Sequence, residues 1–289
     1  MTTTVLVTGA GGFIGRNLVV FLASQGFRVI AASRTATAPD HPNIVTALLP
    51  DLALPFDWQP LLERCDAVVH LAGVAHRFSD DEQYNLVNHL ATAGLAKAAC
   101  RLKKHLIFVS SIAAQSGPFS EQELTEEVPP KPINTYGRSK LAAEQAIRAS
   151  GACFTILRPV VIYGQGEKGN VSIIHKVSRL PIPLPFGALT AQRSILSIGN
   201  FCSAIITVLT DPRAHGETFI VSDPTPVTVS DLISRHRATL GRSPGLVAIP
   251  ERWIELTFAA FGLADTWNRV GRPLVARPSK LLALGWKPG

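Results

Sequence analysis

The stretch of sequence that decides the fold is Val5-Leu-Val-Thr-Gly9-Ala-Gly-Gly12-Phe-Ile-Gly15. A short β-rich run leads into three glycines at a spacing of three, and a helical pattern begins directly after them. Glycines in this arrangement permit a tight turn, close approach of the backbone to a pyrophosphate, and close packing of the helix on the strand. The start of the helix adds free N–H donors and positive potential. The stretch therefore predicts a dinucleotide-binding turn, one residue longer than the commonest GxGxxG form.

Outward from this turn, the first half of the chain alternates short β-rich runs with helical patterns such as 12–25 and 84–100. Such alternation is typical of right-handed βαβ units around a buried parallel sheet. The strands that we expect are 5–8, 28–32, 43–48, 67–72, 106–110 and 154–157. The predicted fold class is therefore α/β, with a Rossmann-like doubly wound parallel sheet.

After residue 158 the alternation stops, and the Gly- and Pro-rich segments 164–170 and 180–185 indicate loops. We expect a smaller substrate-binding lobe here, interleaved in sequence with the main domain. Segments 194–198 and 218–222 are expected to be strands that could return to the main sheet, with a helix at 200–209 between them. Ser230 is the predicted N-cap of a helix ending at Gly241, and a further helix is expected from 251 to about 263. The predicted division assigns 1–164 and 194–222 to the dinucleotide-binding domain, and 165–193 and 223–289 to the lobe.

Composition excludes several classes of protein. Hydrophobic residues make up 46% of the 289 residues and charged residues 17%, which excludes a disordered chain. No apolar run is long enough to cross a membrane, and the first residues lack the pattern of a secretion signal. We therefore expect a cytoplasmic protein that does not bind membranes. The four cysteines are widely spaced, without the Cys/His spacing of a metal site, so neither a disulfide scaffold nor a metal is predicted.

The net charge of +7 favours an anionic partner, and much of the excess lies near the carboxyl terminus. Residues 224–289 hold nine Arg or Lys residues against four Asp or Glu residues. The densest basic cluster, 101–105, has no interleaved aromatic side chains, so nucleic acid is not the expected partner. A small phosphate-bearing ligand fits the charge better.

Ser33-Arg34 occupies the place, after the second expected strand, where NAD-binding sequences carry a carboxylate for the adenosine ribose. A carboxylate would repel a 2′-phosphate, whereas a hydroxyl and a guanidinium can bind one. The sequence thus predicts NADP(H) as the preferred cofactor. NAD(H) remains the alternative, because Arg34 also fits an ordinary loop residue. Asp51 and Leu52, after the third strand, are expected beside the adenine.

Tyr136-Gly-Arg-Ser-Lys140 opens a helical stretch and places a phenol and an ammonium one turn apart on the same helix face. A tyrosine titrates near ~10, so acid/base work near neutral pH requires a positive charge that stabilises its phenolate. Ser110-Ser111 ends the fifth expected strand, which would place it beside the nicotinamide. Together these residues predict a proton-transfer site.

With these motifs in order, the chain resembles the extended short-chain dehydrogenases/reductases of the nucleotide-sugar epimerase/dehydratase family. The segments that carry the resemblance are 8–15, 70–73, 88–92, 108–111, 136–140, 157–159, 163–164, 279–280 and 284–286. The resemblance implies that Tyr136 is the catalytic acid/base and that Lys140 holds the nicotinamide ribose and lowers the Tyr136 pKa. It also implies that Ser111 bonds the reacting sugar oxygen and that Asn88 braces the backbone behind the site.

The resemblance further implies a nucleotide-diphosphate sugar as substrate, gripped by Asn170, Arg193 and Arg272, with Arg269 as a weaker candidate. A homodimer is expected through the helices that begin near Tyr84 and Tyr136. The expected cofactor-binding residues are Gly9, Gly12, Phe13, Ile14, Gly15, Ser33, Arg34, Asp51, Leu52, Leu71, Ala72, Gly73, Tyr136 and Lys140.

The chain departs from the family's dehydratases, which carry an acidic pair after the hydroxyl residue. Ile112 and Ala113 follow Ser111 here, so elimination is disfavoured and hydride transfer at sugar C4 is expected. We favour a reductase of 4-keto sugar nucleotides, similar to reductases of 4-keto-6-deoxy-N-acetylhexosamine nucleotides in bacterial polysaccharide synthesis. A UDP-sugar 4-epimerase is the first alternative. A non-catalytic NADP-sensing regulator or scaffold is the alternative from another class, because fold alone does not fix function.

Overall fold

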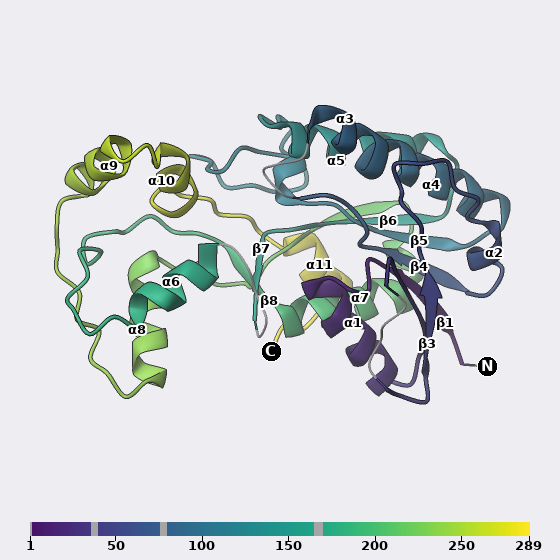
Figure 1. The fold of residues 1–289 in the computed structure, drawn as a ribbon, viewed down its shortest axis with the longest axis horizontal. Coiled ribbons are helices and arrows are strands. Elements are labelled where there is room, and N and C mark those ends of the chain that lie inside the picture. The colour runs from purple at the N-terminus through teal and green to yellow at the C-terminus, as the bar shows by residue number, and fades with distance from the viewer. Residues whose placement is uncertain (1, 36–39, 76–79, 165–169) are drawn as a thin grey trace.

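The computed structural model describes residues 2–35, 40–75, 80–164 and 170–289. Within these residues, a seven-stranded sheet has the order β3-β2-β1-β4-β5-β6-β9, and all neighbouring pairs run parallel (Figure 1). The strands are β1 (Thr4–Thr8), β2 (Arg28–Ser33), β3 (Ile44–Leu48), β4 (Ala67–His70), β5 (His105–Val109), β6 (Phe154–Pro159) and β9 (Glu217–Val221). The predicted doubly wound α/β fold is confirmed.

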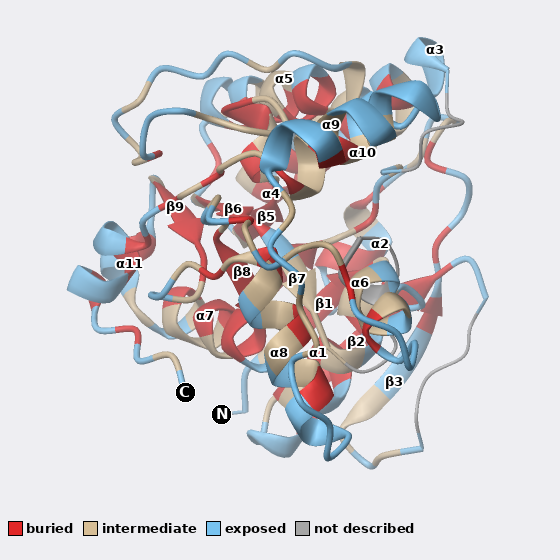
Figure 2. Ribbon diagram, turned by 90° about the vertical axis from the view of Figure 1, so that its left-hand side faces the viewer, coloured by how far each residue is buried: buried red, intermediate tan, exposed pale blue. Residues whose placement is uncertain are grey.

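Helices cover both faces of this sheet. On one face, α1 (Phe13–Ser24) and α7 (Ile198–Thr210) bury apolar side chains against the strands. On the other face, α4 (Ala91–Arg101) and α5 (Thr135–Ala149) do the same. Figure 2 shows the buried residues concentrated on the strands and on the inward sides of these helices. The strands are apolar on both faces, as a covered parallel sheet requires.

Shorter elements connect these layers. They are α2 (Gln59–Leu62), α3 (Asp81–Gln83), the wide π-type turns Tyr84–Leu90, the 3₁₀ turns Ile112–Ala114 and Pro212–Ala214, and α11 (Ser279–Leu284). The strand order reverses between β1 and β4, so a crevice is expected beyond the carboxyl ends of these two strands. The glycine turn after β1 lies at this point.

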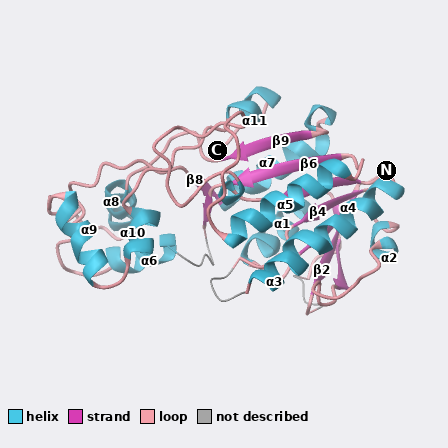
Figure 3. Cartoon of the chain, turned by 90° about the horizontal axis from the view of Figure 1, so that it is seen from above, coloured by secondary structure: helices cyan, strands magenta, loops and turns pink. Residues whose placement is uncertain are grey.

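The remaining helices form a lobe with its own apolar cluster, seen at one end of the molecule in Figure 3. They are α6 (Asn170–Ser178), α8 (Val229–Thr239), α9 (Glu251–Ala260) and α10 (Ala264–Val270). The buried members of the cluster are Leu184, Leu189, Val229, Ile233, Ile254 and Trp267. The lobe is thus assembled from segments on both sides of β9 in the sequence.

Two local predictions are wrong. Segment 194–198 was expected to be able to return to the main sheet, but β8 (Ile195–Ser197) pairs with β7 (Val161–Tyr163) in a separate two-stranded sheet. The reason is that β9 already fills the free edge of β6. Ser230 is not an N-cap, because its hydroxyl donates to the Phe186 carbonyl.

The cap of α8 is Thr228, two residues earlier than predicted. The Thr228 hydroxyl accepts the Asp231 N–H at 3.0 Å, and the Asp231 carboxylate accepts the Thr228 N–H at 2.9 Å. This reciprocal capping box satisfies two N–H groups that a helix start otherwise leaves unpaired. It also lowers the pKa of Asp231, through hydrogen bonds from the Thr228 backbone and hydroxyl. Among the described residues, none of the helices has the length and apolar character needed to span a membrane.

Candidate active site

The glycine turn after β1 is too crowded for side chains. Gly9 has a φ of +71°, and a Cβ placed on it would lie 2.8 Å from the Ala72 backbone nitrogen. A Cβ on Gly15 would overlap the Gly9 carbonyl oxygen, and one on Gly12 would lie 3.3 Å from the same oxygen. These glycines therefore allow α1 to pack directly on the turn, and the turn to touch the segment after β4.

The start of α1 fits a phosphate group. In the part of the chain that the structure describes, no side chain caps α1, whose N-cap residue is Gly12. The first intrahelical bond runs from the Arg16 N–H to the Gly12 carbonyl, so the N–H groups of Phe13 and Ile14 precede the helical ladder. By contrast, the Asn134 side chain caps α5. An uncapped helix start beside a glycine turn is a ready anion site, so these residues fit the pyrophosphate of a dinucleotide.

Ser111 and Tyr136 meet because α5 passes very close to the loop that follows β5. A Cβ on Gly137 would overlap the Ala113 carbonyl oxygen, so only glycine allows this approach. The Asn134 side chain fixes the start of the helix by accepting the Gly137 N–H at 2.7 Å. The pKa of Tyr136 is raised by burial, while a hydrogen bond with the Ser111 side chain acts in the opposite direction. The phenol is therefore protonated at neutral pH before any cofactor adds its charge.

Lys140 lies one turn further along α5 and is 95% buried, with 5% of its surface exposed. Its ammonium donates to the Val109 carbonyl at 3.0 Å and lies 4.8 Å from the centre of the Phe108 ring. A Cβ on Gly73 would lie 3.5 Å from the Lys140 Nζ, so the backbone after β4 approaches this ammonium closely. Burial lowers the pKa of Lys140 to about 8, and the Glu144 carboxylate partly opposes this change.

This lowered pKa predicts how stability depends on pH. Between the folded pKa of about 8 and the ordinary value of 10.5, the unfolded chain binds more protons at Lys140 than the folded chain does. The Lys140 contribution to the unfolding free energy therefore rises with pH in this window, by up to about 1.4 kcal/mol per pH unit. Urea unfolding measures this for the wild type and Lys140→Met. From pH 8 to pH 10, the free energy of unfolding of the wild type should rise relative to that of Lys140→Met. A difference that does not change with pH would contradict the lowered pKa.

A buried polar chain connects the glycine turn with the helices behind the site. The Thr8 hydroxyl lies 2.8 Å from His70 Nδ1, and His70 Nε2 lies 3.2 Å from the Thr92 hydroxyl. Thr92 donates its hydrogen to the Asn88 carbonyl, so His70 Nε2 must be the donor toward Thr92. His70 stays neutral, because burial first and then the Lys140 charge lower its pKa to about 3. Thr8 also accepts the Ala72 N–H at 3.2 Å.

Asn88 holds the segment that follows β4. Its amide oxygen accepts the Val74 N–H at 2.8 Å, and its amide nitrogen donates to the Val74 carbonyl at 2.9 Å. The same nitrogen donates to the Ser139 hydroxyl at 3.0 Å, and Ser139 donates to the Tyr136 carbonyl. Asn88 thus ties the backbone beside the crevice to the helix that carries Tyr136.

Behind Lys140 lies a buried ion pair that the sequence analysis missed. Arg158 binds Glu144 through two nitrogens, at 3.0 and 2.6 Å, and both side chains are almost fully buried. Ser110 donates to Glu144 at 2.5 Å, and Arg158 donates to the Gln115 amide oxygen at 3.1 Å. Glu144 follows Lys140 by four residues, a helical spacing that could have indicated it. No local pattern predicts that Arg158 is its partner.

The residues expected near the adenosine come at or shortly after the carboxyl ends of β2 and β3. Ser33 ends β2, and a Cβ on Gly11 would lie 3.5 Å from its Cβ, so Ser33 is beside the glycine turn. Arg34 is exposed. Asp51 is also exposed and accepts the Ala53 N–H at 3.0 Å, whereas Leu52 is buried in the sheet core.

The three residues expected to bind the substrate, Asn170, Arg193 and Arg272, belong to the segments predicted to form the lobe. The Arg193 guanidinium donates to the carbonyls of Arg272 and Pro118, and burial lowers its pKa to about 10. Arg272 pairs with Glu255 at 2.9 Å and lies over the Phe119 ring. Asn170 begins α6, and its side chain lies outside the described residues.

Residues 5–222 match the model of the NAD dependent epimerase/dehydratase family. The chain belongs to this family. It is an NAD(P)-dependent enzyme of the short-chain dehydrogenase/reductase type, as the resemblance in its sequence implied.

Proteins similar to this chain include epimerases and reductases. The chain is 31% identical to a UDP-glucose 4-epimerase of Vibrio cholerae, covering 100% of this chain and 92% of that protein. It is 27% identical to a ceramide reductase of Caulobacter vibrioides, covering 98% of this chain and 86% of that protein. Proteins at this level of similarity to the chain are thus named for more than one reaction.

Solved structures share the fold. MoeE5 in complex with UDP-glucose and NAD superposes with a TM-score of 0.76 at 22% identity, over 99% of this chain and 93% of that one. A UDP-glucuronic acid 4-epimerase from Bacillus cereus in complex with NAD gives a TM-score of 0.77 at 20% identity, over 99% and 91%. The Rossmann-like architecture of this family member agrees with theirs.

Proposed function

We propose that the protein is an NADPH-dependent reductase that acts on the C4 carbonyl of a 4-keto nucleotide-diphosphate sugar. The observation that carries this proposal is the hydrogen bond between the Ser111 and Tyr136 side chains, with the buried Lys140 ammonium one helical turn further along α5 and close to the Gly73 backbone. Full-length similarity to the Vibrio cholerae UDP-glucose 4-epimerase supports a sugar nucleotide as substrate. MoeE5, which shares the fold, is described in complex with UDP-glucose.

In this mechanism the chain provides a proton and fixes the positions of the reacting groups. NADPH, when bound, supplies a hydride to the carbonyl carbon. Tyr136 donates its phenolic proton to the carbonyl oxygen as negative charge develops there. Ser111 donates a hydrogen bond to the same oxygen, and the buried Lys140 ammonium stabilises the phenolate that remains. The Val109 carbonyl and the Glu144 carboxylate keep Lys140 oriented and charged.

The residues after Ser111 argue against a dehydratase. Ile112 is buried and Ala113 is apolar, so this loop offers no carboxylate to remove a sugar C5 proton. The side chain that follows, Ala114, is also buried. The loop therefore supports hydride transfer without elimination.

The preference for NADPH rests on Ser33 and Arg34. We expect Arg34→Ala to raise the KM for NADPH about tenfold, since a charge-assisted contact to the 2′-phosphate is worth roughly 1.5 kcal/mol. The KM for NADH should change less than twofold, because that cofactor lacks the phosphate. Steady-state kinetics with both cofactors checks this, with the exposed Arg28 at the opposite end of β2 as the matched control (Arg28→Ala). Equal changes for the two cofactors would argue that Arg34 does not contact the 2′-phosphate.

A UDP-sugar 4-epimerase is the second candidate, and the 31% identity with the Vibrio cholerae enzyme favours it. An epimerase oxidises and then reduces the same sugar, so it consumes no cofactor overall. A regulator that binds the cofactor without catalysis is the third candidate. The arrangement of Ser111, Tyr136 and Lys140 speaks against a regulator, because simple cofactor sensing needs no proton donor.

One assay separates these candidates. The purified protein is mixed with NADPH and a panel of 4-keto and parent nucleotide sugars, and nicotinamide absorbance and sugar composition are followed together. Stoichiometric NADPH oxidation with a 4-keto sugar supports the reductase. Isomerisation of a parent sugar without net oxidation would replace it with the epimerase, and cofactor binding with neither reaction would favour the regulator.

Three further features belong to this proposal. The separate apolar cluster supports a substrate lobe, for which we propose the segments 165–193 and 223–289 beside a dinucleotide-binding domain of 1–164 and 194–222; Leu281 and Trp286, at the end of the second lobe segment, pack in the core of the sheet domain instead. We propose a homodimer through α5 and through the helical segment that begins at Tyr84 and continues as α4. We also propose a cytoplasmic role in bacterial polysaccharide synthesis. Size-exclusion chromatography with light scattering tests the oligomeric state. A mass of two chains is expected, and a mass of one chain would contradict the dimer.

A further inference from the structure

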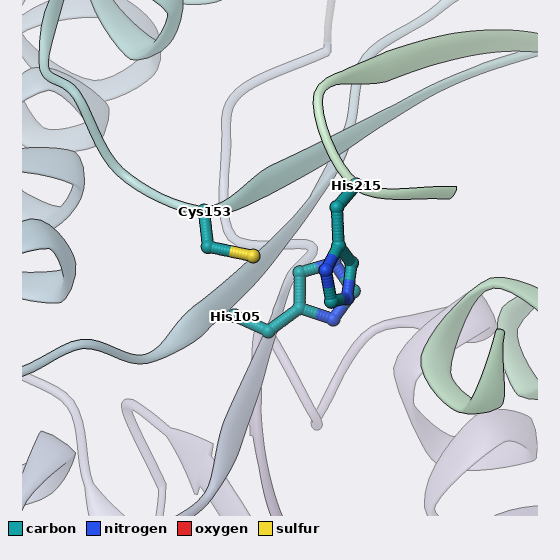
Figure 4. Close-up of side chains that lie close together, drawn as sticks. All are labelled: His105, Cys153 and His215. Atoms are coloured by element: carbon teal, nitrogen blue, oxygen red, sulfur yellow. The ribbon is translucent and has the colours of Figure 1, made fainter. Parts of the chain in front are cut away.

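Three side chains of types that can ligate a metal, two histidines and a cysteine, lie together at the amino-terminal ends of three neighbouring strands. His105 begins β5, Cys153 directly precedes β6, and His215 lies two residues before β9. One donor atom from each of the three lies within 4.8 Å of the others, and Figure 4 shows the thiol beside the two rings. We propose that His105, Cys153 and His215 bind a zinc-type transition-metal ion at the amino-terminal ends of these strands.

The register of the parallel sheet brings these residues together. Leu106 pairs with Phe154 between β5 and β6, and Thr155 pairs with Glu217 between β6 and β9. Neighbouring strands are about 4.8 Å apart, so the residues that precede these pairs lie side by side. The two histidines reach across the start of β6 until their ring centres are 4.4 Å apart. Their wide separation in sequence explains why ligand spacing along the chain does not predict the site.

A half-buried hydrogen bond orients the His105 ring for metal binding. His105 Nε2 lies 2.9 Å from the Thr155 hydroxyl, and that hydroxyl donates its own hydrogen to the Ala214 carbonyl at 2.8 Å. Nε2 must therefore be the donor in the bond to Thr155. In the neutral ring, Nδ1 then carries no proton, and its lone pair can bind a metal. Histidine ligands of metals characteristically donate their second ring nitrogen to a neighbouring group in this way.

Binding a metal ion at Cys153 requires loss of the thiol proton, because the thiolate is the ligand. Binding forms a metal–sulfur bond and breaks the S–H bond, and the thiol proton leaves to solvent. Uptake of each ion should thus release about one proton near pH 7.

The donor set selects the class of ion. Two imidazoles and a thiolate suit Zn²⁺ and disfavour Mg²⁺ and Ca²⁺, which prefer oxygen ligands. Cys153 and His215 are exposed, so an ion can enter from solvent and a water can complete a tetrahedral shell.

The site lies far from the proton-transfer residues. β5 runs from His105, beside the proposed metal site, to Val109, whose carbonyl accepts a hydrogen bond from the Lys140 ammonium. This length of strand spans about 13 Å. The ion therefore does not touch the substrate. It links the starts of β5, β6 and β9, and we expect it to stabilise the folded domain without changing turnover.

Cobalt and zinc titrations of the full chain, stripped of metal by a chelator, test the proposal. One equivalent of Co²⁺ should give a near-ultraviolet thiolate-to-cobalt absorption band, which Cys153→Ser removes. In competition with a chromophoric chelator, Cys153→Ser and His215→Ala should each weaken Zn²⁺ binding at least tenfold. Zn²⁺ at a hundred times its Kd should raise the wild-type Tm by about 5 °C.

Matched controls keep the result interpretable. Cys100→Ser and His89→Ala change the same residue types outside the cluster and should bind Zn²⁺ like the wild type. His215→Gln is the conservative variant if His215→Ala does not fold, with circular dichroism as the check. The proposal is overturned if Co²⁺ gives no thiolate band, or if Zn²⁺ binds Cys153→Ser as tightly as the wild type. These readouts do not depend on the proposed reaction, so failure of either idea leaves the other standing.

Discussion

Replacing Tyr136 with Phe should reduce kcat about a thousandfold, because general acid catalysis by a positioned side chain contributes roughly 10² to 10⁴. The substitution removes one oxygen atom from the site and leaves the ring. Lys140 keeps its bond to the Val109 carbonyl, and the glycine turn is not touched. Cofactor affinity should therefore stay within about threefold of the wild type. Turnover by stopped assay and cofactor affinity by fluorescence titration measure the two effects separately.

Tyr84 offers a matched control for this substitution. Its ring centre lies 6.1 Å from that of Tyr136, at an angle of 58°, and burial raises its pKa as well. In the proposed mechanism only Tyr136 donates the proton, so Tyr84→Phe should keep at least a third of the wild-type kcat. A large loss in Tyr84→Phe, with activity retained in Tyr136→Phe, would reverse the roles of the two phenols.

Arg158→Met should lower the free energy of unfolding by about 3–5 kcal/mol, because it leaves the Glu144 carboxylate buried without its partner. Arg158 and Glu144 have only 4% and 1% of their side-chain surface exposed. Glu144 would keep the bond from Ser110, which cannot replace two guanidinium contacts. Urea unfolding at pH 7 measures the loss.

A double variant and a surface variant give this prediction its controls. Arg158→Met combined with Glu144→Leu should recover most of the lost stability, since it removes both buried charges. Arg277, paired with Glu123 at the surface, is the matched arginine. Arg277→Met should change the free energy of unfolding by less than about 1 kcal/mol. Equal losses in Arg158→Met and Arg277→Met would mean that burial does not govern the ion pair.

Features set by short local patterns could be predicted from the sequence. The glycine turn combines a strand, three glycines and a helix within a few residues, and the structure confirms the Rossmann-like sheet built on it. The Tyr136–Lys140 pair depends only on helical spacing, and the structure places Tyr136 beside Ser111.

Features that depend on contacts between distant segments could not be predicted. Arg158 meets Glu144 only because β6 and α5 lie together, and the carbonyl partners of Arg193 come from loops about 75 residues away in sequence. The pairing of β8 was mispredicted for the same reason. Periodicity along one strand does not indicate which strand it pairs with, and β8 pairs with β7 rather than with the main sheet. Such contacts are decided by packing rather than by propensity.

Transfer of deuterium from the cofactor to the sugar tests the central claim most directly. The protein is incubated with NADPH carrying deuterium at the transferable position of nicotinamide C4 and with a 4-keto nucleotide sugar, and the product is analysed by mass spectrometry and NMR. Our account predicts one deuterium on the sugar's C4 with the wild type and almost none with Tyr136→Phe over the same time. A reduced sugar without deuterium at C4, or equal transfer by Tyr136→Phe, would contradict it.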